Sequence, residues 1–267
     1  MRAAKKFLVV ANWKMNKTVK ETAEFAGKFR SVSGGKVEAV ICPPFTSLSV
    51  LSQKIKNKKV GVGAQNMFYE DSGTFTGEVS PPMVKEFCKY VIIGHSERRK
   101  NLGETDEMVN KKVKKALGHG IVPIVCMGET LEEREAGRGH AIVEKQLRGA
   151  LQDVDRADVP KIEFAYEPLW AISKGACDKN TRTATPEDAE EMHVFIRKIL
   201  AGMYGRTAAD NARVIYGGSV RADSVSQFTA MRNVDGVLVG GASLDPESFR
   251  GIIENAQKSL SKKRKDR

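Results

Sequence analysis

Eight short apolar segments, each followed by a stretch with helical periodicity, recur at regular spacing along nearly the whole 267-residue chain. The predicted strands span residues 7–13, 37–42, 60–65, 90–95, 121–127, 162–167, 213–216 and 237–239. Alternating strands and helices favour a parallel sheet, because each helix carries the chain back to start the next strand in the same direction. Eight such units in about 250 residues fit a closed (β/α)8 barrel better than an open sheet.

The predicted fold is therefore α/β: a closed barrel of eight parallel strands ringed by helices. No Pro-, Gly- or Ser-rich linker separates the units, so residues 1–267 are expected to form one domain, with a basic tail from about residue 259. One of the predicted helices begins near Thr105 and is ended by Gly118 and Gly120. Its apolar positions face inward, which places Lys111, Lys112, Lys114 and Lys115 at the surface.

The sixth strand ends at a carboxylate, Glu167, because Pro168 cannot donate to a sheet ladder. Seventeen residues then separate Glu167 from Thr185, where a Thr-Pro-Glu-Asp sequence begins the next helix. Loops of this length in compact domains are usually lids, binding loops or disordered. Apolar residues 169–171 could cover the carboxylate, which would otherwise be a solvated charge, and raise its pKa. We therefore expect Glu167 to act as a base beneath a movable loop.

Chemistry in such barrels takes place at the carboxyl ends of the strands, so the residues found there are informative. Strand one leads to Lys14, which could place a cation over the barrel mouth; a lone lysine is otherwise a surface residue. Strand four ends at His95, just before a turn whose free N–H groups would keep the imidazole neutral. A histidine packed in the core is the alternative interpretation.

Glycine pairs stand at the ends of two neighbouring strands. Gly217-Gly218 precedes Ser219 after strand seven, and Gly240-Gly241 follows strand eight. Backbone N–H groups at such sites can approach an anion closely, and these loops commonly bind phosphate in (β/α)8 barrels. A base, a neutral hydrogen-bond donor, a cation and a phosphate cradle suit proton abstraction beside a carbonyl on a small phosphorylated sugar. We expect no metal and no cofactor.

The bulk composition disfavours several other classes of protein. No apolar run approaches membrane-spanning length, and residues 7–11 are too short for a signal-peptide core. The four cysteines form no Cys-x-x-Cys pair, which indicates a reducing, cytosolic setting. The net charge is +11, and the last ten residues carry six Lys or Arg against one Asp. A solvated tail is the favoured interpretation, so nucleic-acid binding is not expected, and the remaining positive charge suits an anionic substrate.

Five stretches resemble the motifs of the triosephosphate isomerase family, in the family's order. They are NWKMN at 12–16, GHSERR at 94–99, AYEPLWAI at 165–172, YGGSV at 216–220 and GGASL at 240–244. The resemblance extends from about Phe7 to Ala256. It implies a TIM barrel and a cofactor-free enzyme that interconverts dihydroxyacetone phosphate and D-glyceraldehyde 3-phosphate through an enediolate, in cytoplasmic glycolysis and gluconeogenesis.

The resemblance also implies roles for single residues. Glu167 moves the proton between two substrate carbons, His95 polarises the carbonyl, and Lys14 stabilises negative charge. The implied substrate-binding residues are Asn12, Lys14, Ser173, Ser219, Gly240 and Gly241. Asn12 helps to place the substrate, and Lys14 also stabilises charge on the phosphate. The phosphate is held by backbone N–H groups of Ser219, Gly240 and Gly241, and Ser173 stands where a glycine of the family donates its N–H. Glu97 and Cys126 match family positions near the site, in a supporting role.

Two longer segments complete the comparison with the family. The loop at 65–78 resembles the one that inserts into a partner subunit, which implies a homodimer with Thr76 near the loop tip. Residues 173–182 depart from the pattern, because ten residues stand where the family has the four residues Gly-Thr-Gly-Lys. We expect residues 176–182 to form an exposed bulge with an accessible Cys177, while residues 171–175 still close over Glu167.

Two other functions stay open on the residues alone. A Schiff-base aldolase on the same barrel would use Lys14 as its nucleophile. A basic nucleic-acid- or partner-binding protein with an inert barrel would depend on the C-terminal tail, which is its only support.

Overall fold

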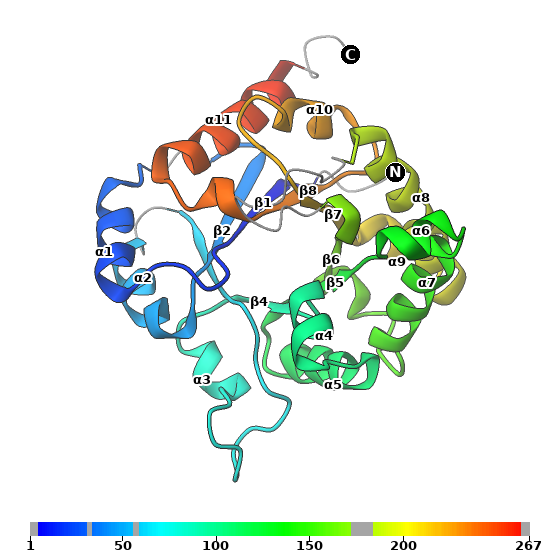
Figure 1. Cartoon of the computed structure of the whole chain (residues 1–267), viewed down its shortest axis with the longest axis horizontal. Coiled ribbons are helices and arrows are strands. Elements are labelled where there is room, and N and C mark those ends of the chain that lie inside the picture. The colour runs from blue at the N-terminus through cyan, green and yellow to red at the C-terminus, as the bar shows by residue number, and fades with distance from the viewer. Residues whose placement is uncertain (1–4, 31–33, 56–58, 172–183, 263–267) are drawn as a thin grey trace.

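The structure, a computed structural model, describes residues 5–30, 34–55, 59–171 and 184–262. Eight strands pair in chain order, each parallel to the next, and the last strand returns to the first to close a barrel (Figure 1). The strands are β1 (Phe7–Asn12), β2 (Val37–Cys42), β3 (Gly61–Ala64), β4 (Tyr90–Ile93), β5 (Val122–Met127), β6 (Glu163–Tyr166), β7 (Arg213–Gly218) and β8 (Gly236–Val239). The predicted (β/α)8 barrel is confirmed.

Helices surround the barrel on the outside (Figure 1). Those of the described residues are α1 (Val19–Lys28), α2 (Leu48–Ile55), α3 (Pro81–Lys85), α4 (Ser96–Leu102), α5 (Asp106–Gly118), α6 (Leu131–Glu135), α7 (Gly139–Ala150), α8 (Pro186–Tyr204), α9 (Arg206–Asn211), α10 (Val225–Ala230) and α11 (Pro246–Lys262). The sequence analysis missed two of them, α4 and α9. Both are short, polar and follow closely on another element, so neither has a clear apolar period.

Each strand is apolar on both faces, because both faces are buried. Alternate residues of β1 show the arrangement: Leu8 and Val10 belong to the core inside the barrel, whereas Phe7, Val9 and Ala11 pack in the layer between the barrel and the helices. This double burial explains why the strands appear in the sequence as continuous apolar runs.

Local signals fix the ends of several helices. Thr185 caps α8 by accepting from the Asp188 N–H, Asp188 binds back to the Thr185 N–H, and Pro186 occupies the first turn. At the other end of the chain, α11 continues to Lys262. The first four residues of the predicted basic tail are therefore helical, and residues 263–267 lie outside the described residues.

One surface prediction is wrong. Lys112 on α5 is buried, with its Nζ donating to Asn66 Oδ1 at 2.8 Å and paired with Glu104. A lysine can be buried when a carboxylate and a hydrogen-bond acceptor meet its charge, and periodicity cannot reveal partners that come from other elements.

No helix in the described part of the chain is both long and apolar enough to cross a lipid bilayer.

An ion network links four strands at the amino-terminal end of the barrel. Arg213 on β7 binds Glu163 of β6 (Nε–Oε2 2.7 Å) and Glu38 of β2 (Nη1–Oε2 2.7 Å). Glu38 also accepts a hydrogen bond from Tyr90 of β4. Glu163 is only 4% exposed, and burial raises its pKa although Arg213 opposes the shift. Arg213 is therefore the partner that makes the burial of Glu163 tolerable.

We expect Arg213→Met to lower the free energy of unfolding by about 3 kcal/mol, because it leaves a buried carboxylate unpaired. The matched control is Arg148→Met, which removes a half-exposed ion pair with Glu144 within α7 and should change stability by less than about 0.5 kcal/mol. Denaturant unfolding of both variants measures the difference. Equal losses would contradict the role given to the network.

Candidate active site

Barrel closure brings the ends of β1, β4, β6 and β8 together around one opening. Lys14, two residues beyond β1, places its Nζ 2.7 Å from Glu97 Oε1 at the start of α4. Its side chain also passes Gly240, where an added Cβ would stand 3.6 Å from Lys14 Cε. Three positions that are far apart in the sequence therefore share one site.

Glu167 is held against His95. His95 Nε2 lies 3.2 Å from Glu167 Oε1, and the Ser96 N–H donates to Oε2 at 3.3 Å. The exposed fraction is 3% for Glu167 and 6% for His95. The Glu167 backbone is fixed as well, since its N–H donates to Met127 O at 2.7 Å. The predicted base and the predicted electrophile thus form one buried, hydrogen-bonded pair.

The pair shifts both pKa values. Burial works to raise the pKa of Glu167, but His95 and the Ser96 N–H outweigh it, so the pKa lies below its ordinary value. The expectation that burial would raise this pKa is therefore wrong for this arrangement. Burial works to lower the pKa of His95, but the Glu167 carboxylate outweighs it, so the pKa is raised.

The predicted free N–H group beside His95 is present. His95 is the N-cap of α4, and its Nδ1 accepts a hydrogen bond from the Glu97 N–H at 3.3 Å. That bond needs a lone pair on Nδ1, so a neutral imidazole with its proton on Nε2 satisfies both ring contacts. The helix start therefore favours the neutral form, against the influence of Glu167.

The backbone of Lys14 is left-handed, with φ 51°. Such a conformation is unfavourable for a residue with a Cβ and persists where neighbours hold it. The Asn12 side chain accepts from the Lys14 N–H at 3.0 Å, and Gln65 Nε2 donates to the Lys14 carbonyl at 2.9 Å. Asn12, predicted to bind substrate, is buried at 5% exposure and orients Lys14. Gln65 was not predicted as a site residue.

The glycines after β7 and β8 leave backbone uncovered. Ser219 and Gly241 are exposed, and an added Cβ at Gly241 would meet nothing within 4 Å. Gly217 has a different role, because an added Cβ there would stand 2.7 Å from Glu167 Cγ. Gly217 thus makes room for the carboxylate, while Ser219 and Gly241 are open to a ligand. Ser173, the remaining predicted binding residue, lies outside the described residues, as do the expected bulge and Cys177.

Glu129, just after β5, is a residue that the sequence analysis missed. It is fully buried, and its Oε1 accepts from Tyr166 Oη at 2.9 Å and Trp170 Nε1 at 2.8 Å. Its carbonyl accepts from the Leu169 N–H at 3.0 Å. It therefore anchors the start of the loop that follows Glu167. The sequence does contain a signal for Glu129, because it is a carboxylate just beyond the end of a strand, as Glu167 is.

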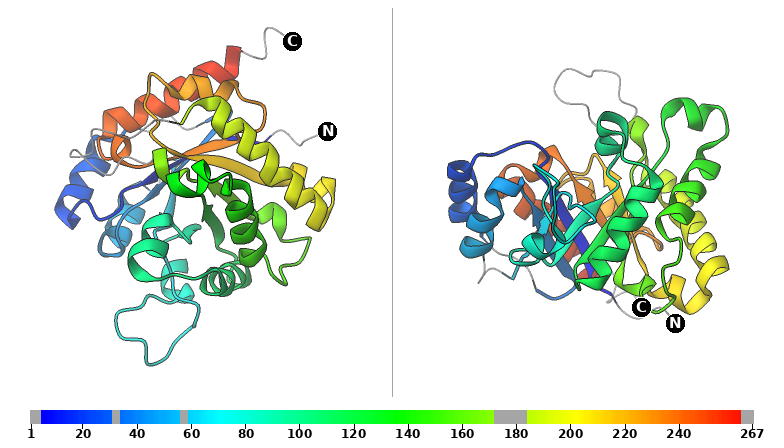
Figure 2. Two further views of the ribbon diagram at one scale, coloured as in Figure 1. Left: turned by 45° about the vertical axis from the view of Figure 1, so that its right-hand side comes forward. Right: turned by 90° about the horizontal axis from the view of Figure 1, so that it is seen from below.

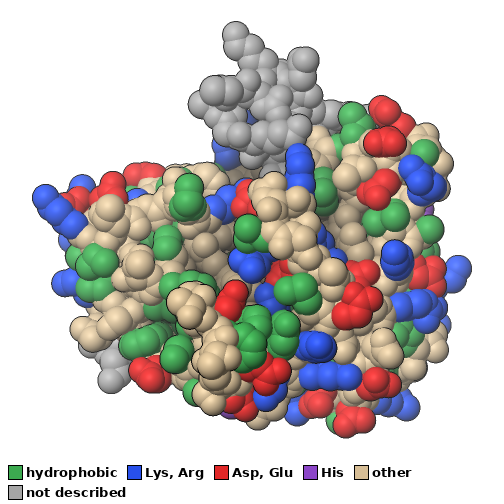
Figure 3. Space-filling model, turned by 60° about the horizontal axis from the view of Figure 1, so that its bottom comes forward, with side chains coloured by type: hydrophobic (Ala, Val, Ile, Leu, Met, Phe, Trp, Pro, Cys, Tyr) green, Lys and Arg blue, Asp and Glu red, His purple; other side chains and the backbone are tan. Residues whose placement is uncertain are grey.

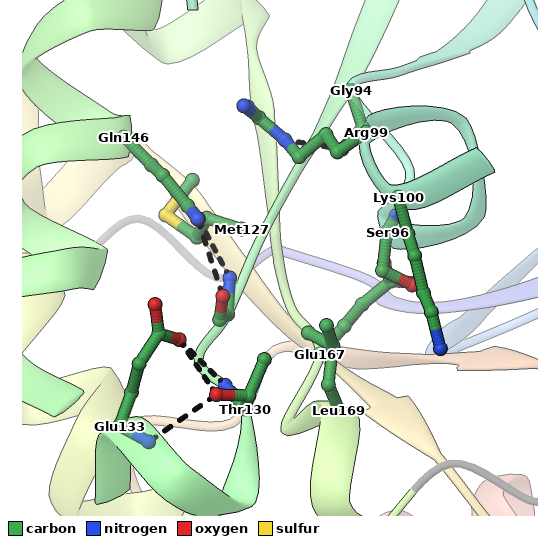
Figure 4. A pocket seen from close by; sticks show the side chains of 11 residues that line it. Gly94, Ser96, Arg99, Lys100, Met127, Thr130, Glu133, Gln146, Glu167 and Leu169 are labelled. Carbon is green, nitrogen blue, oxygen red and sulfur yellow. Dashed lines mark hydrogen bonds between the residues drawn. The ribbon is translucent and has the colours of Figure 1, made fainter. Parts of the chain in front are cut away.

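A cavity of about 220 Å³ lies behind Glu167. Figure 4 shows Glu167 and Ser96 on one side of it and Gln146 and Met127 on the other. Neither His95 nor Lys14 lines this cavity.

Among the described residues, no three His, Cys, Asp or Glu side chains gather as a metal site requires. Cys126 is fully buried near Glu167, and burial raises the pKa of its thiol well above the ordinary value. It is therefore not an activated nucleophile.

Lys14 forms an ion pair with Glu97, and the ammonium form that this pair needs is not a nucleophile, so the contact gives the aldolase alternative no support.

Comparisons with known proteins agree with this geometry. The family model described as triosephosphate isomerase matches residues 7–256. Among curated relatives, the triosephosphate isomerases of Dictyoglomus thermophilum and Endomicrobium trichonymphae are each 47% identical to this chain, covering 93% and 94% of it and 98% of each relative. The triosephosphate isomerase of Clostridium botulinum is 45% identical over 92% of this chain and 98% of its own. The chain belongs to the triosephosphate isomerase family.

Proposed function

We propose that Glu167, His95 and Lys14 carry out the reaction of this family, the interconversion of dihydroxyacetone phosphate and D-glyceraldehyde 3-phosphate. The observation that carries the assignment is the buried contact between Glu167 Oε1 and His95 Nε2 at 3.2 Å, with the Lys14 ammonium at the same opening. A base and a hydrogen-bond donor in contact with each other can act on adjacent atoms of one small substrate.

The reaction needs a base that takes a proton from one substrate carbon and returns it to the next. As the Glu167 carboxylate removes the proton, the electron pair of the C–H bond forms the carbon–carbon double bond of an enediolate. The carbonyl oxygen gains negative charge, which the Nε2–H of His95 stabilises. The proton of the hydroxyl on the first carbon passes to the oxygen that gained the charge, so that a carbonyl forms at the first carbon. Return of the abstracted proton to the neighbouring carbon completes the isomerisation and restores the carboxylate.

The contact between Glu167 and His95 also implies a rearrangement when substrate binds. The Nε2–H of His95 now faces the carboxylate, so the substrate carbonyl must take the carboxylate's place at that donor. The buried carboxylate must then face a substrate carbon. The residues that follow Glu167 are anchored to Glu129, through the Leu169 N–H and the Trp170 side chain. This anchored segment is next to the carboxylate that must shift, which supports a role for the loop after Glu167 in placing the base.

Lys14 supplies the positive charge for the enediolate and the phosphate, and Asn12 orients it. The backbone N–H groups of Ser219, Gly240 and Gly241 are the proposed phosphate donors; Ser219 and Gly241 are exposed and Gly240 is half-buried. Ser173 is proposed to add its own N–H from the loop.

We also propose that two copies of the chain associate through residues 65–78, which belong to the loop at 65–80 that projects from the barrel (Figures 1 and 2). Hydrophobic side chains are exposed on this side of the molecule (Figure 3). Phe75 in the loop is 43% exposed, and Met15, beside Lys14, is 96% exposed. A second copy would cover these apolar groups and place a loop beside Lys14.

The buried free thiols of Cys42, Cys88 and Cys126 suit the proposed cytoplasmic setting.

Glu167→Asp should retain the fold and lose turnover by about a hundredfold, because the shorter side chain withdraws the carboxylate from the reacting carbon. A coupled assay of glyceraldehyde 3-phosphate isomerisation measures the loss, and circular dichroism checks the fold. Turnover equal to that of the natural protein would remove Glu167 from the mechanism.

His95→Gln should reduce turnover by about a hundredfold while affinity for inorganic phosphate stays unchanged, because the imidazole acts on the reacting oxygen and not on the phosphate. Steady-state kinetics and a phosphate competition assay give the two numbers. Parallel losses in both would indicate that His95 serves binding.

Lys14→Ala should weaken phosphate binding by about tenfold through the loss of a nearby cation. Lys17→Ala is the matched control, since Lys17 is also left-handed, with φ 74°, and its ammonium lies over the Trp13 and Phe25 rings. Equal weakening in both variants would mean that general charge, and not Lys14, attracts the anion. Trapping of substrate on Lys14 by borohydride would instead favour an aldolase.

A further inference from the structure

Helix α5 presents a row of basic side chains to the loop at residues 65–80. Lys111, Lys115 and His119 follow one another at intervals of four residues along α5 and its C-cap, so they share one face of the helix. The sequence analysis counted these lysines only as solvated charges.

Two members of this row hold a single loop carboxylate. Lys115 Nζ lies 2.9 Å from Asp71 Oδ2, and His119 Nε2 lies 2.8 Å from Asp71 Oδ1. Hydrogen bonds from Lys115 and His119 lower the pKa of Asp71. The third member, Lys111, places its ammonium 5.1 Å from the ring centroid of Tyr69.

A buried contact from the same helix holds the base of the loop. Lys112 Nζ donates to Asn66 Oδ1 at 2.8 Å and pairs with Glu104, and Lys112 and Glu104 are both almost completely buried. The four basic residues of α5 and its C-cap therefore grip the loop at Asn66, Tyr69 and Asp71. We call these contacts the α5 clamp.

Beyond the clamp, the loop has little to fix its shape. Residues 70–78 are all exposed. Phe68 stacks on Tyr69 with centroids 4.2 Å apart and meets Phe75 in a tilted contact at 4.7 Å. The Phe68 N–H donates to the Val79 carbonyl at 2.8 Å. The aromatic group that orders the tip thus includes Tyr69, which the clamp itself holds.

We propose that the α5 clamp fixes the shape of the loop within each protomer before it meets a second copy of the chain. This inference rests on the proposed dimer and goes beyond it, because it assigns part of the association energy to residues of the loop's own subunit. A loop that is already ordered loses less conformational entropy on docking, which tightens association without any new contact with the partner.

The test compares two loop carboxylates in adjacent positions. Asp71→Asn removes the clamped charge. Glu70→Gln makes the same change one residue earlier, where the described part of the chain shows no ion pair. We expect Asp71→Asn to raise the dimer dissociation constant by about tenfold, because each protomer loses the ion pair with Lys115 and the hydrogen bond with His119, and Glu70→Gln to leave it unchanged. Sedimentation equilibrium measures both constants.

A second pair of variants tests the helix side. Lys115→Gln should also weaken the dimer, by less than Asp71→Asn because the His119 contact remains, whereas Lys114→Gln, which removes an ion pair with Asp153 away from the loop, should not. In the double variant of Asp71 and Lys115, the two losses should not add, because each already breaks the same contact.

Hydrogen exchange of the loop amides, measured at dilutions where the dimer has dissociated, separates shape from direct contact. The Phe68 and Glu78 N–H groups should exchange faster in Asp71→Asn than in Glu70→Gln. If the two variants have equal exchange rates but different dissociation constants, Asp71 contacts the partner directly. If their dissociation constants are equal, the clamp has no effect on association. Either result overturns this inference and leaves the proposed dimer intact. A natural protein that stays monomeric at every concentration would overturn both proposals.

Discussion

The closure of β8 onto β1 is the constraint on which the rest of the molecule depends. At this seam Gly236 lies opposite Leu8, and a Cβ on Gly236 would stand 2.3 Å from the Leu8 carbonyl oxygen. The strands can therefore approach each other here only because the residue is glycine. Without closure, Lys14 at the end of β1 and Gly240 at the end of β8 would lie at opposite edges of an open sheet. With closure they are neighbours, and the site has a cation beside the backbone that is proposed to bind phosphate.

Within the site, two opposing influences act on the same imidazole. The Glu97 N–H at the start of α4 favours neutral His95, while the buried Glu167 carboxylate favours the imidazolium. Hydrogen bonds fix the backbone around the site: the N–H of Glu167 is bound to Met127 O, and Asn12 and Gln65 hold the backbone of Lys14. The backbone positions of these residues are thus set before any reaction begins, and the rearrangement on substrate binding is confined to the Glu167 side chain and the loop beyond it.

The sequence predicts the barrel, because eight apolar runs must each be covered on both faces. Family motifs then identify Glu167, His95 and Lys14, and the structure brings these three side chains to one opening. What the sequence could not reveal depends on pairs of distant residues. Lys112 is a surface residue by periodicity, and only Asn66 and Glu104 explain its burial. The role of Glu129 depends on its hydrogen bond from Trp170, and the direction of the Glu167 pKa shift depends on the position of His95.

The ion network around Arg213 and the pair of Glu167 and His95 lie at opposite ends of the same strands. Glu163 and Glu167 are four residues apart along β6 and beyond it, a separation of roughly 13 Å at about 3.3 Å per residue. Substitutions more than about 10 Å apart without shared partners have nearly additive effects on stability. The amino-terminal end of the barrel can therefore change as a lineage adapts to a hotter or colder habitat, while the groups that meet the substrate keep their positions. This separation lets heat resistance and chemistry evolve on different residues of one strand.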